Sequence, residues 1–505
     1  MSRKYLDIKA NPAICNTDDI PVLPYHEFYD LVSNLLADES KHCLVYFAVP
    51  SGENLQFYIA IADDTRNGIL LAAHVSERKG AVLQSLASGA YQLHGFEREI
   101  HENYGVRFEG HPWFKPVRFP YNRHDQNSVM ENYPFYSIES EELHEVGVGP
   151  VHAGVIEPGH FRFICNGEKV LHLEIQLGYQ HRGVEQLMLA KESALQRCIL
   201  SENIAGDTAI GHALAHAQLT EALSETPENE TLHIERCIAL ELERMAVHIG
   251  DTAALCGDVA YQLGQVVCEA LRTTVINTTQ LWCGNRFGKS LIRPGGSNFP
   301  LTEEVAESIL KLLDDTGRRY AEMADRIFTL PSLLARFEDI GIVTREQALK
   351  LGLVGMAARS SGLFRDVRIS HPFQFYRNFP VQPVVQTSGD VLARALQRKK
   401  EVDESIRIIQ NLVARWKENK ADVPMPSYHS KLRPSTFAIS LTEGWRGEIC
   451  HTAVTNAEGK LQHYKIKDAS FHNWMALALA VRNQEISDFP LCNKSYNLSY
   501  CGHDL

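Results

Sequence analysis

The sequence predicts an α+β protein, in which a small α/β sandwich-like domain precedes a mainly helical large domain. Two observations predict this fold class. Between residues 43 and 75, apolar and polar side chains alternate in three short runs that turn-forming residues separate, which is typical of β-strands. Beyond residue 183 the apolar residues follow the helical period over much longer stretches. This second pattern is typical of a bundle of long helices, here with β-hairpins at its periphery.

The boundary between the two patterns is a polar and aromatic stretch that follows Pro120. We therefore expect an N-terminal domain at 1–120, an ordered linker at 121–145 and the large domain at 146–505. In the N-terminal domain the expected helix covers 89–104. Gly105 suits its end, because glycine readily takes the left-handed conformation that closes a helix.

The large domain contains two expected hairpins and four expected helical stretches. The hairpins cover 161–178, with a turn at Asn166-Gly167, and 448–468. The helices cover 183–224, 230–283, 303–328 and 389–418. In the second helix, Asn229 marks the start and the following apolar residues fall near one face, as a buried bundle helix requires: Ile234, Ile238, Leu242, Met245 and Ile249.

Composition restricts the class of function. The 505 residues are 44% hydrophobic and 22% charged, as in ordinary globular proteins, and the net charge of −12 argues against broad nucleic-acid binding. No apolar run approaches the roughly 20 residues that span a bilayer, and the first residues lack the apolar core of a signal peptide. A role at a membrane would thus require docking to a subunit that crosses it. The 11 cysteines form no C-x-x-C pair, so we expect reduced, buried thiols.

A first motif lies at 96–113, FEREIHENYGVRFEGHPW. It combines an acidic helix end, a glycine turn and a His-Pro pair, and Glu97, Arg98, Glu99 and Glu102 can form ion pairs at helical spacing. Nothing in this pattern requires catalysis, so we interpret it as a docking surface. The segment resembles the signature of the 30 kDa subunit of complex I.

A second series of motifs extends from residue 147 to the C-terminus. Its main pieces are Gly149-Pro150-Val151-His152, 177–183, Glu243-Arg244-Met245, Arg286-Phe287, 293–296, 359–368 and Arg446-Gly447-Glu448. In this order they resemble the 49 kDa subunit of complex I and, more closely, the large subunit of group 4 membrane-bound hydrogenases. The fusion of both domains in one chain resembles the hydrogenase-4 and formate hydrogenlyase type.

The chain departs from that family at the nickel–iron ligands, which are two C-x-x-C motifs because thiolates bind and bridge soft metals. The first pair aligns with Ala205 and Thr208, and the second aligns with Ser499 and Gly502. A shift of one residue would place Cys501 at one ligand position and leave its partner missing. We therefore expect no metal centre in this chain and no hydrogen chemistry.

The resemblance to complex I implies a quinone site in the same cavity, formed by a tyrosine and a histidine. Here Gly206 stands at the tyrosine position, and His152 is the nearest candidate for the histidine. The resemblance also implies a proton-relay carboxylate at Glu157, with a surface acid in a turn as an equal alternative. A carboxyl group in a dry cavity can have its pKa raised toward neutrality, which suits proton transfer.

Further candidate residues follow the aligned ligand positions. Asp207, His212 and His216 lie along one expected helix, and the two histidines share a face. They indicate either a polar line along the cavity wall or satisfied core histidines, whereas a zinc site lacks an acidic third ligand at a diagnostic spacing. Four ionisable residues on the long helix indicate a buried ion-pair network or a proton path: Glu243, Arg244, His248 and Asp251.

Other candidates are implied by the resemblance to lie near a neighbouring iron–sulfur subunit. His181, Arg182, Arg286 and Arg359 would face its cluster, where positive charge stabilises the reduced state. Ordinary ion pairing is the alternative for each arginine. No Gly-x-Gly-x-x-Gly loop follows a strand, so we expect no NADH site in this chain.

Three hypotheses about function remain. The chain is the large subunit of a complex I-like oxidoreductase with a quinone or proton-coupling cavity, or a redox-inactive scaffold between an iron–sulfur subunit and a proton-pumping membrane arm, or a hydrogenase. The missing thiolates argue against the third. The expected partners are a small iron–sulfur subunit, a ferredoxin-like subunit and antiporter-like membrane subunits, at the cytoplasmic face of the bacterial inner membrane. The expected cofactors are a quinone here and an iron–sulfur cluster in the partner.

Overall fold

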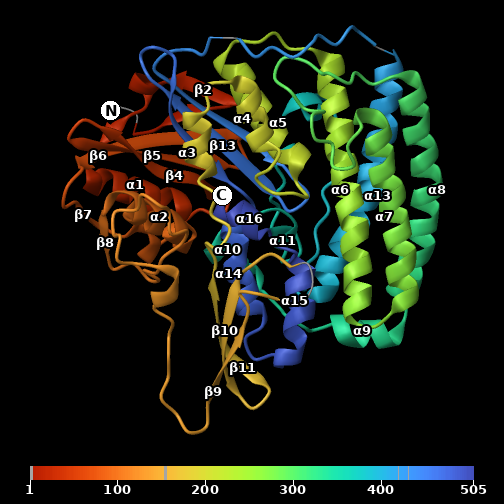
Figure 1. Ribbon diagram of the computed structural model, residues 1–505, viewed down its shortest axis with the longest axis horizontal. Helices are drawn as coiled ribbons and strands as arrows, with labels where there is room; N and C mark the ends of the chain where they lie inside the picture. Colours follow the sequence, from red (N-terminus) through yellow and green to blue (C-terminus); the bar gives the residue numbers. More distant parts are fainter. Residues whose placement is uncertain (1–3, 153–155, 419, 430) are drawn as a thin grey trace.

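The computed structural model describes residues 4–152, 156–418, 420–429 and 431–505. It confirms the α+β fold class: β-sheets and short helices form one side of the molecule, and a bundle of long helices forms the other (Figure 1). A narrow hairpin projects between them. No described helix is both long enough and apolar enough to cross a membrane.

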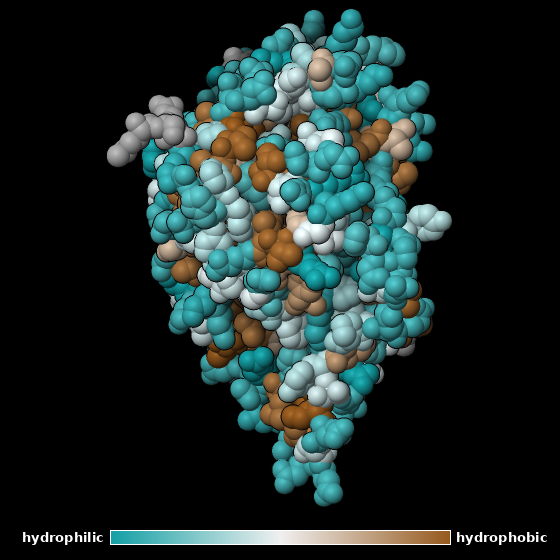
Figure 2. All heavy atoms as spheres, turned by 90° about the vertical axis from the view of Figure 1, so that its left-hand side faces the viewer, coloured by the Kyte–Doolittle hydropathy of each residue, from teal (hydrophilic) through white to brown (hydrophobic). Residues whose placement is uncertain are grey.

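The N-terminal sheet contains the three predicted strands β4 (Lys41–Ser51), β5 (Asn54–Asp63) and β6 (Gly68–Glu77), which pair antiparallel. The short strands β1 (Leu6–Ile8) and β3 (Val22–Leu23) both pair with β6. The face of the molecule on this side is mainly hydrophilic, with separate apolar patches between the polar side chains (Figure 2).

Two helices pack on this sheet, α1 (Tyr25–Leu36) and α2 (His94–Tyr104). The second begins later than predicted because Tyr91–Leu93 forms a 3-10 turn. It ends as predicted at Gly105, whose φ is 74°. The strands β7 (Val82–Gln84) and β8 (Arg107–Glu109) pair beside α2.

Three acidic residues of the 96–113 motif, Glu97, Glu99 and Glu102, are buried, and Glu99 joins the two domains. Glu99 accepts hydrogen bonds from Lys465 Nζ at 2.6 Å and from Arg118. Glu102 accepts from the backbone of Val117 at 2.8 Å. The docking surface that we predicted for this motif therefore contacts the large domain of the same chain.

A central sheet belongs to both ends of the chain. It has the order β14 (Leu461–Lys467), β13 (Glu448–Thr455), β12 (Thr436–Glu443) and β2 (Ala13–Asn16). Strands β13 and β14 are the predicted C-terminal hairpin. The pairing of β2 with β12, in which Ala13 lies opposite Ile439, was not predicted, because four residues carry too little pattern to indicate a distant partner.

The bundle consists of α6 (Glu230–Asp258), α7 (Gln262–Cys283), α8 (Glu303–Ile327) and α13 (Val391–Glu418). Asn229 caps α6, since its side chain accepts from Leu232 N at 2.9 Å, and the five predicted face residues are all buried. A single helix over 230–283 was wrong. The chain reverses at Ala260, whose φ is 58°, and apolar residues continue across the turn and hide it from the pattern.

The predicted helix over 183–224 is likewise three helices: α3 (Val184–Ala190), α4 (Ala194–Ser201) and α5 (Ala209–Leu223). Helix α5 packs on β12 and β13. The loop before α5 is held from outside the helix, because Glu202 accepts from Arg293 at 2.6 Å. Sequence periodicity cannot detect such a tertiary contact.

The projecting sheet has the order β11 (Lys169–Gln176), β10 (His160–Asn166) and β9 (His144–Val148), and it contains the predicted hairpin with its turn at Asn166-Gly167. The remaining helices are short: α9 (Pro331–Phe337), α10 (Arg345–Leu351), α11 (Gly355–Arg359), α12 (Val367–Ser370), α14 (Ser470–Ala480), α15 (Phe489–Tyr496) and α16 (Tyr500–Asp504).

Candidate functional site

Two turns that are far apart in the sequence meet at the candidate site: the loop before α5 and the turn that begins α16. Arg182 joins them. Its Nη1 donates to Asn203 O at 2.5 Å, and its Nη2 donates to Ile204 O at 2.8 Å and to Cys501 O at 3.0 Å. Because the guanidinium is a planar group with five donors, one side chain holds both turns in a fixed relation.

The four positions aligned with nickel–iron ligands lie on these two turns. Thr208 Oγ1 accepts from Arg446 Nη1 at 3.1 Å, and Ser499 Oγ accepts from Gly502 N at 2.9 Å. Ala205 and Gly502 carry no side-chain donor atom. These residues do not fit a nickel–iron centre, which requires thiolates to bridge the two metals.

One thiol, that of Cys501, lies beside these positions. Its sulfur is 3.4 Å from Ser499 Oγ, and burial together with the negative charge of Glu157 raises its pKa to about 11. The thiol therefore stays protonated at neutral pH, whereas metal binding requires the thiolate. Within the described ranges, no group of three His, Cys, Asp or Glu side chains is placed to hold a metal ion.

The predicted carboxylate Glu157 reaches the same turn. Its Oε2 accepts from Tyr500 N at 3.3 Å, and its carboxyl group also bonds to the thiol of Cys501. His152, by contrast, bonds within its own turn, with Nε2 3.0 Å from Gly159 O. Residues 153–155, between these two candidates, lie outside the described ranges. The quinone role of His152 stays a prediction.

Asp207 and Arg446 form the central ion pair of the site. Arg446 donates from Nη1 to Asp207 Oδ1 at 2.6 Å and from Nη2 to Oδ2 at 2.7 Å. The guanidinium stacks on Trp445 at 3.9 Å, and Trp445 Nε1 donates to Asp207 O at 2.9 Å. Arg446 is buried, whereas 38% of the Asp207 side chain is exposed. The bidentate geometry fixes a carboxylate at the open edge of the site.

Glu243 of α6 lies behind Asp207. Its carboxyl group accepts from the backbone N–H groups of Ile210 at 2.7 Å and Gly211 at 3.1 Å, which belong to the first turn of α5. Burial raises its pKa to about 8, and Asp207 adds to the shift, although both hydrogen bonds favour the ionised form. A carboxyl group with this pKa exchanges its proton near neutral pH, which suits general acid–base chemistry.

His212 lies behind the second turn. Its Nε2 is 3.0 Å from Asp468 Oδ2, and its Nδ1 is 3.1 Å from His451 Nε2. Asp468 also lies against the turn that begins α16, because a Cβ added to Gly502 would be 2.8 Å from the Cγ of Asp468. The structure thus places His212 in a polar contact with the site through Asp468.

Of the residues predicted to face an iron–sulfur subunit, two lie at the site and one lies beside it. His181 Nδ1 is 2.7 Å from Asp504 O, next to the hydrogen bonds by which Arg182 joins the two turns. Arg286 is exposed, and the described chain offers it no hydrogen bond or ion pair. Its neighbour Phe287 is 40% exposed, and Ile199 is 46% exposed. Whether these groups face a cluster stays a prediction.

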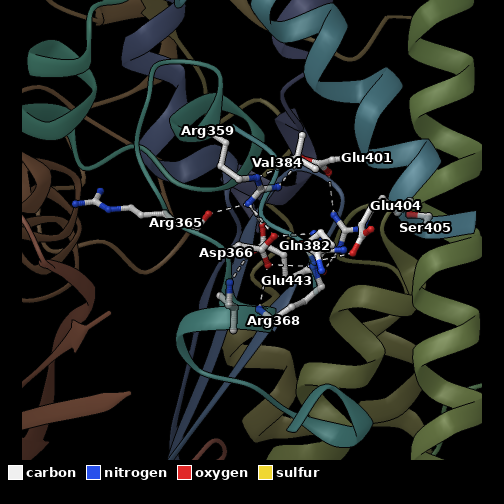
Figure 3. A network of polar contacts seen from close by, with 12 residues as sticks. Arg359, Arg365, Asp366, Arg368, Gln382, Val384, Glu401, Glu404, Ser405 and Glu443 are labelled. Carbon is white, nitrogen blue, oxygen red and sulfur yellow. Dashed lines mark hydrogen bonds and ion pairs between the residues drawn. The ribbon is translucent and has the colours of Figure 1, made fainter. Parts of the chain in front are cut away.

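The fourth of these residues, Arg359, lies inside the protein in a network of ion pairs (Figure 3). It is 1% exposed and donates to Glu401 of α13 at 2.8 Å and to Glu443 of β12 at 2.7 Å. Arg368 and Asp366 extend the network with a pair at 2.6 Å. The network joins the bundle to the central sheet, and the charge of Arg359 is balanced by acids of this chain.

The other predicted residues of α6 belong to the same or adjoining contacts. Arg244 donates to Glu401 at 3.4 Å, and His248 Nε2 lies 2.9 Å from the same oxygen. Asp251 accepts from Arg398 at 2.8 Å. Of the two readings that the sequence left open, an ion-pair network describes these three residues, whereas Glu243 forms no ion pair with any described residue and bonds to backbone N–H groups instead.

The fold and this site define a class, the large subunit of complex I-like redox complexes. Residues 25–135 match the family described as "Respiratory-chain NADH dehydrogenase, 30 Kd subunit", and residues 258–436 match the family described as "Respiratory-chain NADH dehydrogenase, 49 Kd subunit". The chain is therefore a fused 30 kDa/49 kDa-type subunit of an oxidoreductase complex, as its motifs predicted.

Known proteins are similar to this chain over most of its length. The chain is 27% identical to hydrogenase-4 component G of Escherichia coli, over 80% of this chain and 72% of that protein. It is 26% identical to formate hydrogenlyase subunit 5 of the same organism, over 80% and 74%. A solved structure of the membrane-bound sulfane sulfur reductase, an archaeal respiratory membrane complex, has the same fold, with a TM-score of 0.67, 20% identity, and coverage of 73% of this chain and 100% of that chain.

Proposed function

We propose that this subunit docks an iron–sulfur subunit and lines a quinone or proton-coupling site at the place where nickel–iron relatives hold their metals. The observation that carries the proposal is that ionisable side chains surround four aligned positions that lack thiolates. Asp207 belongs to one of the two turns that Arg182 joins, and Arg446 and Glu157 bond to these turns from other parts of the fold. A proton-exchanging carboxyl group, Glu243, lies behind Asp207. Groups of this kind bind polar carbonyl oxygens and transfer protons, and they bind nickel poorly.

The surface beside the site supports docking of a partner there. Lys289 Nζ donates to the side chain of Asn203 at 2.6 Å, which joins the segment of Arg286 and Phe287 to the loop before α5. Exposed apolar and cationic side chains therefore border the turn that carries Asp207. Exposed apolar groups next to arginine are typical of protein interfaces.

The partners that we propose are a small iron–sulfur subunit at this surface, a ferredoxin-like subunit and antiporter-like membrane subunits, with the chain on the cytoplasmic face of a bacterial inner membrane. In this arrangement the iron–sulfur cluster belongs to the partner. The chain itself would hold a quinone head group and no nickel–iron centre.

The experiment is isolation of the membrane complex through a tag on this subunit, followed by a count of nickel and iron per chain. The same preparation is assayed with dithionite-reduced methyl viologen as electron donor and decylubiquinone as acceptor. We expect iron without nickel, quinone reduction, and a loss of most of that rate in Asp207→Asn. Asp315→Asn, on an exposed helix face, is the matched control and should keep the full rate.

Other outcomes decide between the alternatives. Nickel in a near-equal ratio to the chain would restore the hydrogenase hypothesis and show that the alignment at Ala205, Thr208, Ser499 and Gly502 is wrong. Iron without any quinone reduction, in a complex that still translocates protons, would favour the redox-inactive scaffold.

A further inference from the structure

Five buried side chains form a continuous hydrogen-bonded line behind the candidate site. They come from separate parts of the fold: helix α5, strands β13 and β14, and the segment between β14 and α14. In order along the line they are Asp468, His212, His451, Tyr464 and His216.

Every step of this line has hydrogen-bonding distance. His212 Nε2 is 3.0 Å from Asp468 Oδ2, and His212 Nδ1 is 3.1 Å from His451 Nε2. The Tyr464 hydroxyl is 2.9 Å from His451 Nδ1 and 2.8 Å from His216 Nδ1. None of the four ring-bearing residues is more than 3% exposed, so water does not compete for these contacts.

The charges along the line are set by its surroundings. Burial opposes ionisation of Asp468, but the hydrogen bond from His212 and the charge of Arg446 hold its pKa below the usual range. Burial holds the pKa of His451 well below its usual value and lowers that of His216 to about 3. Asp468 is thus a carboxylate, and these two imidazoles are neutral.

When His212 is neutral, as the path requires, every hydrogen bond has one direction. The carboxylate can only accept, so His212 Nε2–H donates to Asp468 and a neutral His212 must accept at Nδ1. The same rule then makes His451 Nε2–H the next donor, the Tyr464 hydroxyl the donor to His451 Nδ1, and His216 Nδ1–H the donor to the Tyr464 oxygen. Each contact uses one hydrogen, and all four point toward Asp468.

Both ends of the line are placed for exchange. At one end, Asp468 lies against Gly502. A Cβ at this position would be only 2.8 Å from the Cγ of Asp468, so the carboxylate can lie this close to the turn because residue 502 is a glycine. At the other end, His216 bonds through Nδ1 to Tyr464, and the described residues offer its Nε2 no hydrogen bond, so Nε2 can accept a proton. The cations nearest this end are Arg197 of α4 and Arg293.

We propose that this line is a proton path between His216 and the candidate site. A proton binds at His216 Nε2, and the Nδ1 proton of His216 moves to the Tyr464 oxygen. The hydroxyl proton moves to His451 Nδ1, the Nε2 proton of His451 moves to His212 Nδ1, and the Nε2 proton of His212 moves to Asp468. One proton enters and one arrives, with no change in the bonding of heavy atoms.

This inference deepens the proposed function, because it supplies the protons that reduction at the site would consume. It does not depend on the identity of the acceptor. Asp468 delivers its proton at the turn that bears Ser499 and Cys501, and Arg446 stabilises the carboxylate that remains.

The test is proton uptake by the intact, purified complex after photoreduction of its iron–sulfur centres with a deazaflavin, followed with a pH-sensitive dye. Tyr464→Phe keeps the ring and removes the central hydroxyl, and we expect uptake to slow on the order of 10²-fold. Tyr320→Phe is the matched control, because Tyr320 is equally buried and its hydroxyl, among the described residues, bonds to Thr252 alone, at 2.9 Å, inside the bundle. The control should leave uptake unchanged.

A second variant, His216→Asn, tests the path if Tyr464→Phe does not fold. His216→Asn retains an N–H group for the Tyr464 oxygen but cannot accept a proton at one atom and release it from another, so it should slow uptake equally. Unchanged uptake in either folded variant, or no uptake by the unsubstituted complex, overturns the path. Slowed uptake in a complex that does not reduce decylubiquinone would preserve the path and refute the quinone part of the proposed function.

Discussion

Arg446 and Asp207 face each other in a bidentate ion pair, with N–O distances of 2.6 and 2.7 Å, and only the carboxylate side reaches solvent. The pair joins the loop before α5 to the hairpin turn between β12 and β13. It also leaves the face of Trp445 covered by the guanidinium. The geometry of the candidate site therefore depends on a contact between residues that are 239 positions apart.

Asp207→Asn should lower the free energy of unfolding of the chain by about 1–2 kcal/mol, because the buried guanidinium of Arg446 loses its counter-charge while solvent at the open edge screens part of the loss. Chemical denaturation of the isolated subunit, or of the complex if the subunit is insoluble alone, measures this change. Asp315→Asn breaks a pair between exposed side chains and should cost less than about 1 kcal/mol. Equal effects of the two substitutions would contradict the assignment.

Arg359→Met should be far more destabilising, by about 3–5 kcal/mol, since it leaves Glu401 and Glu443 buried without their main cation. The urea midpoint of the variant reports the loss. Arg318→Met removes a cation of similar size from an exposed helix face and serves as the control. A urea midpoint within error of that of the unsubstituted protein would show that Arg359 does not pair with Glu401 and Glu443 as described.

The pKa of Glu243 predicts a pH-dependent stability. Burial raises this pKa to about 8 from an ordinary value of 4.5. The folded chain therefore binds the proton more tightly than the unfolded chain, and the contribution of this group to stability is lost as the pH rises from about 4.5 to 8. The glutamine in Glu243→Gln does not titrate. The melting temperature of this variant, measured relative to that of the unsubstituted protein, should therefore increase between pH 5 and pH 8. A constant difference in melting temperature across this range would mean that Glu243 has an ordinary pKa. Glu304→Gln, at the exposed start of α8, is the control for the loss of a carboxylate.

Two glycines of the site should respond differently to a methyl group. In Gly502→Ala the new Cβ would lie 2.8 Å from Asp468 Cγ and 2.9 Å from Ser499 Oγ, and we expect a loss of about 1–3 kcal/mol from overpacking. In Gly206→Ala the new Cβ meets nothing within 4 Å, and stability should hardly change. Thermal denaturation of the pair tests the close approach of Asp468 to the turn, and tolerance of both substitutions would argue against it.

The sequence predicted those elements whose signals are local. The strands β4 to β6, the hairpin turn at Asn166-Gly167, the Asn229 cap and the buried face of α6 all follow from residues close together in the chain. The breaks within the predicted helices were missed, because apolar residues continue through the turn at Ala260 and because Glu202 is held by the distant Arg293.

At the candidate site, sequence reasoning found single residues and missed their partners. Asp207, His212 and Glu243 stood out because they are ionisable residues within helical patterns. Nothing local indicates that Arg446 pairs with Asp207, or that His451 and Tyr464 lie between His212 and His216. The alternation of polar residues along the C-terminal hairpin is the one signal that could have suggested an inward-facing histidine and tyrosine, and it does not identify what they meet.

The pairing of β2 with β12 bears on how the two domains are joined. Ala13–Asn16 forms an edge of a sheet whose other three strands come from the last quarter of the chain. A covalent cut within 121–145 would consequently leave the first domain anchored through backbone hydrogen bonds and through Glu99 and Lys465. We therefore expect the two halves to stay associated after a protease cuts this segment.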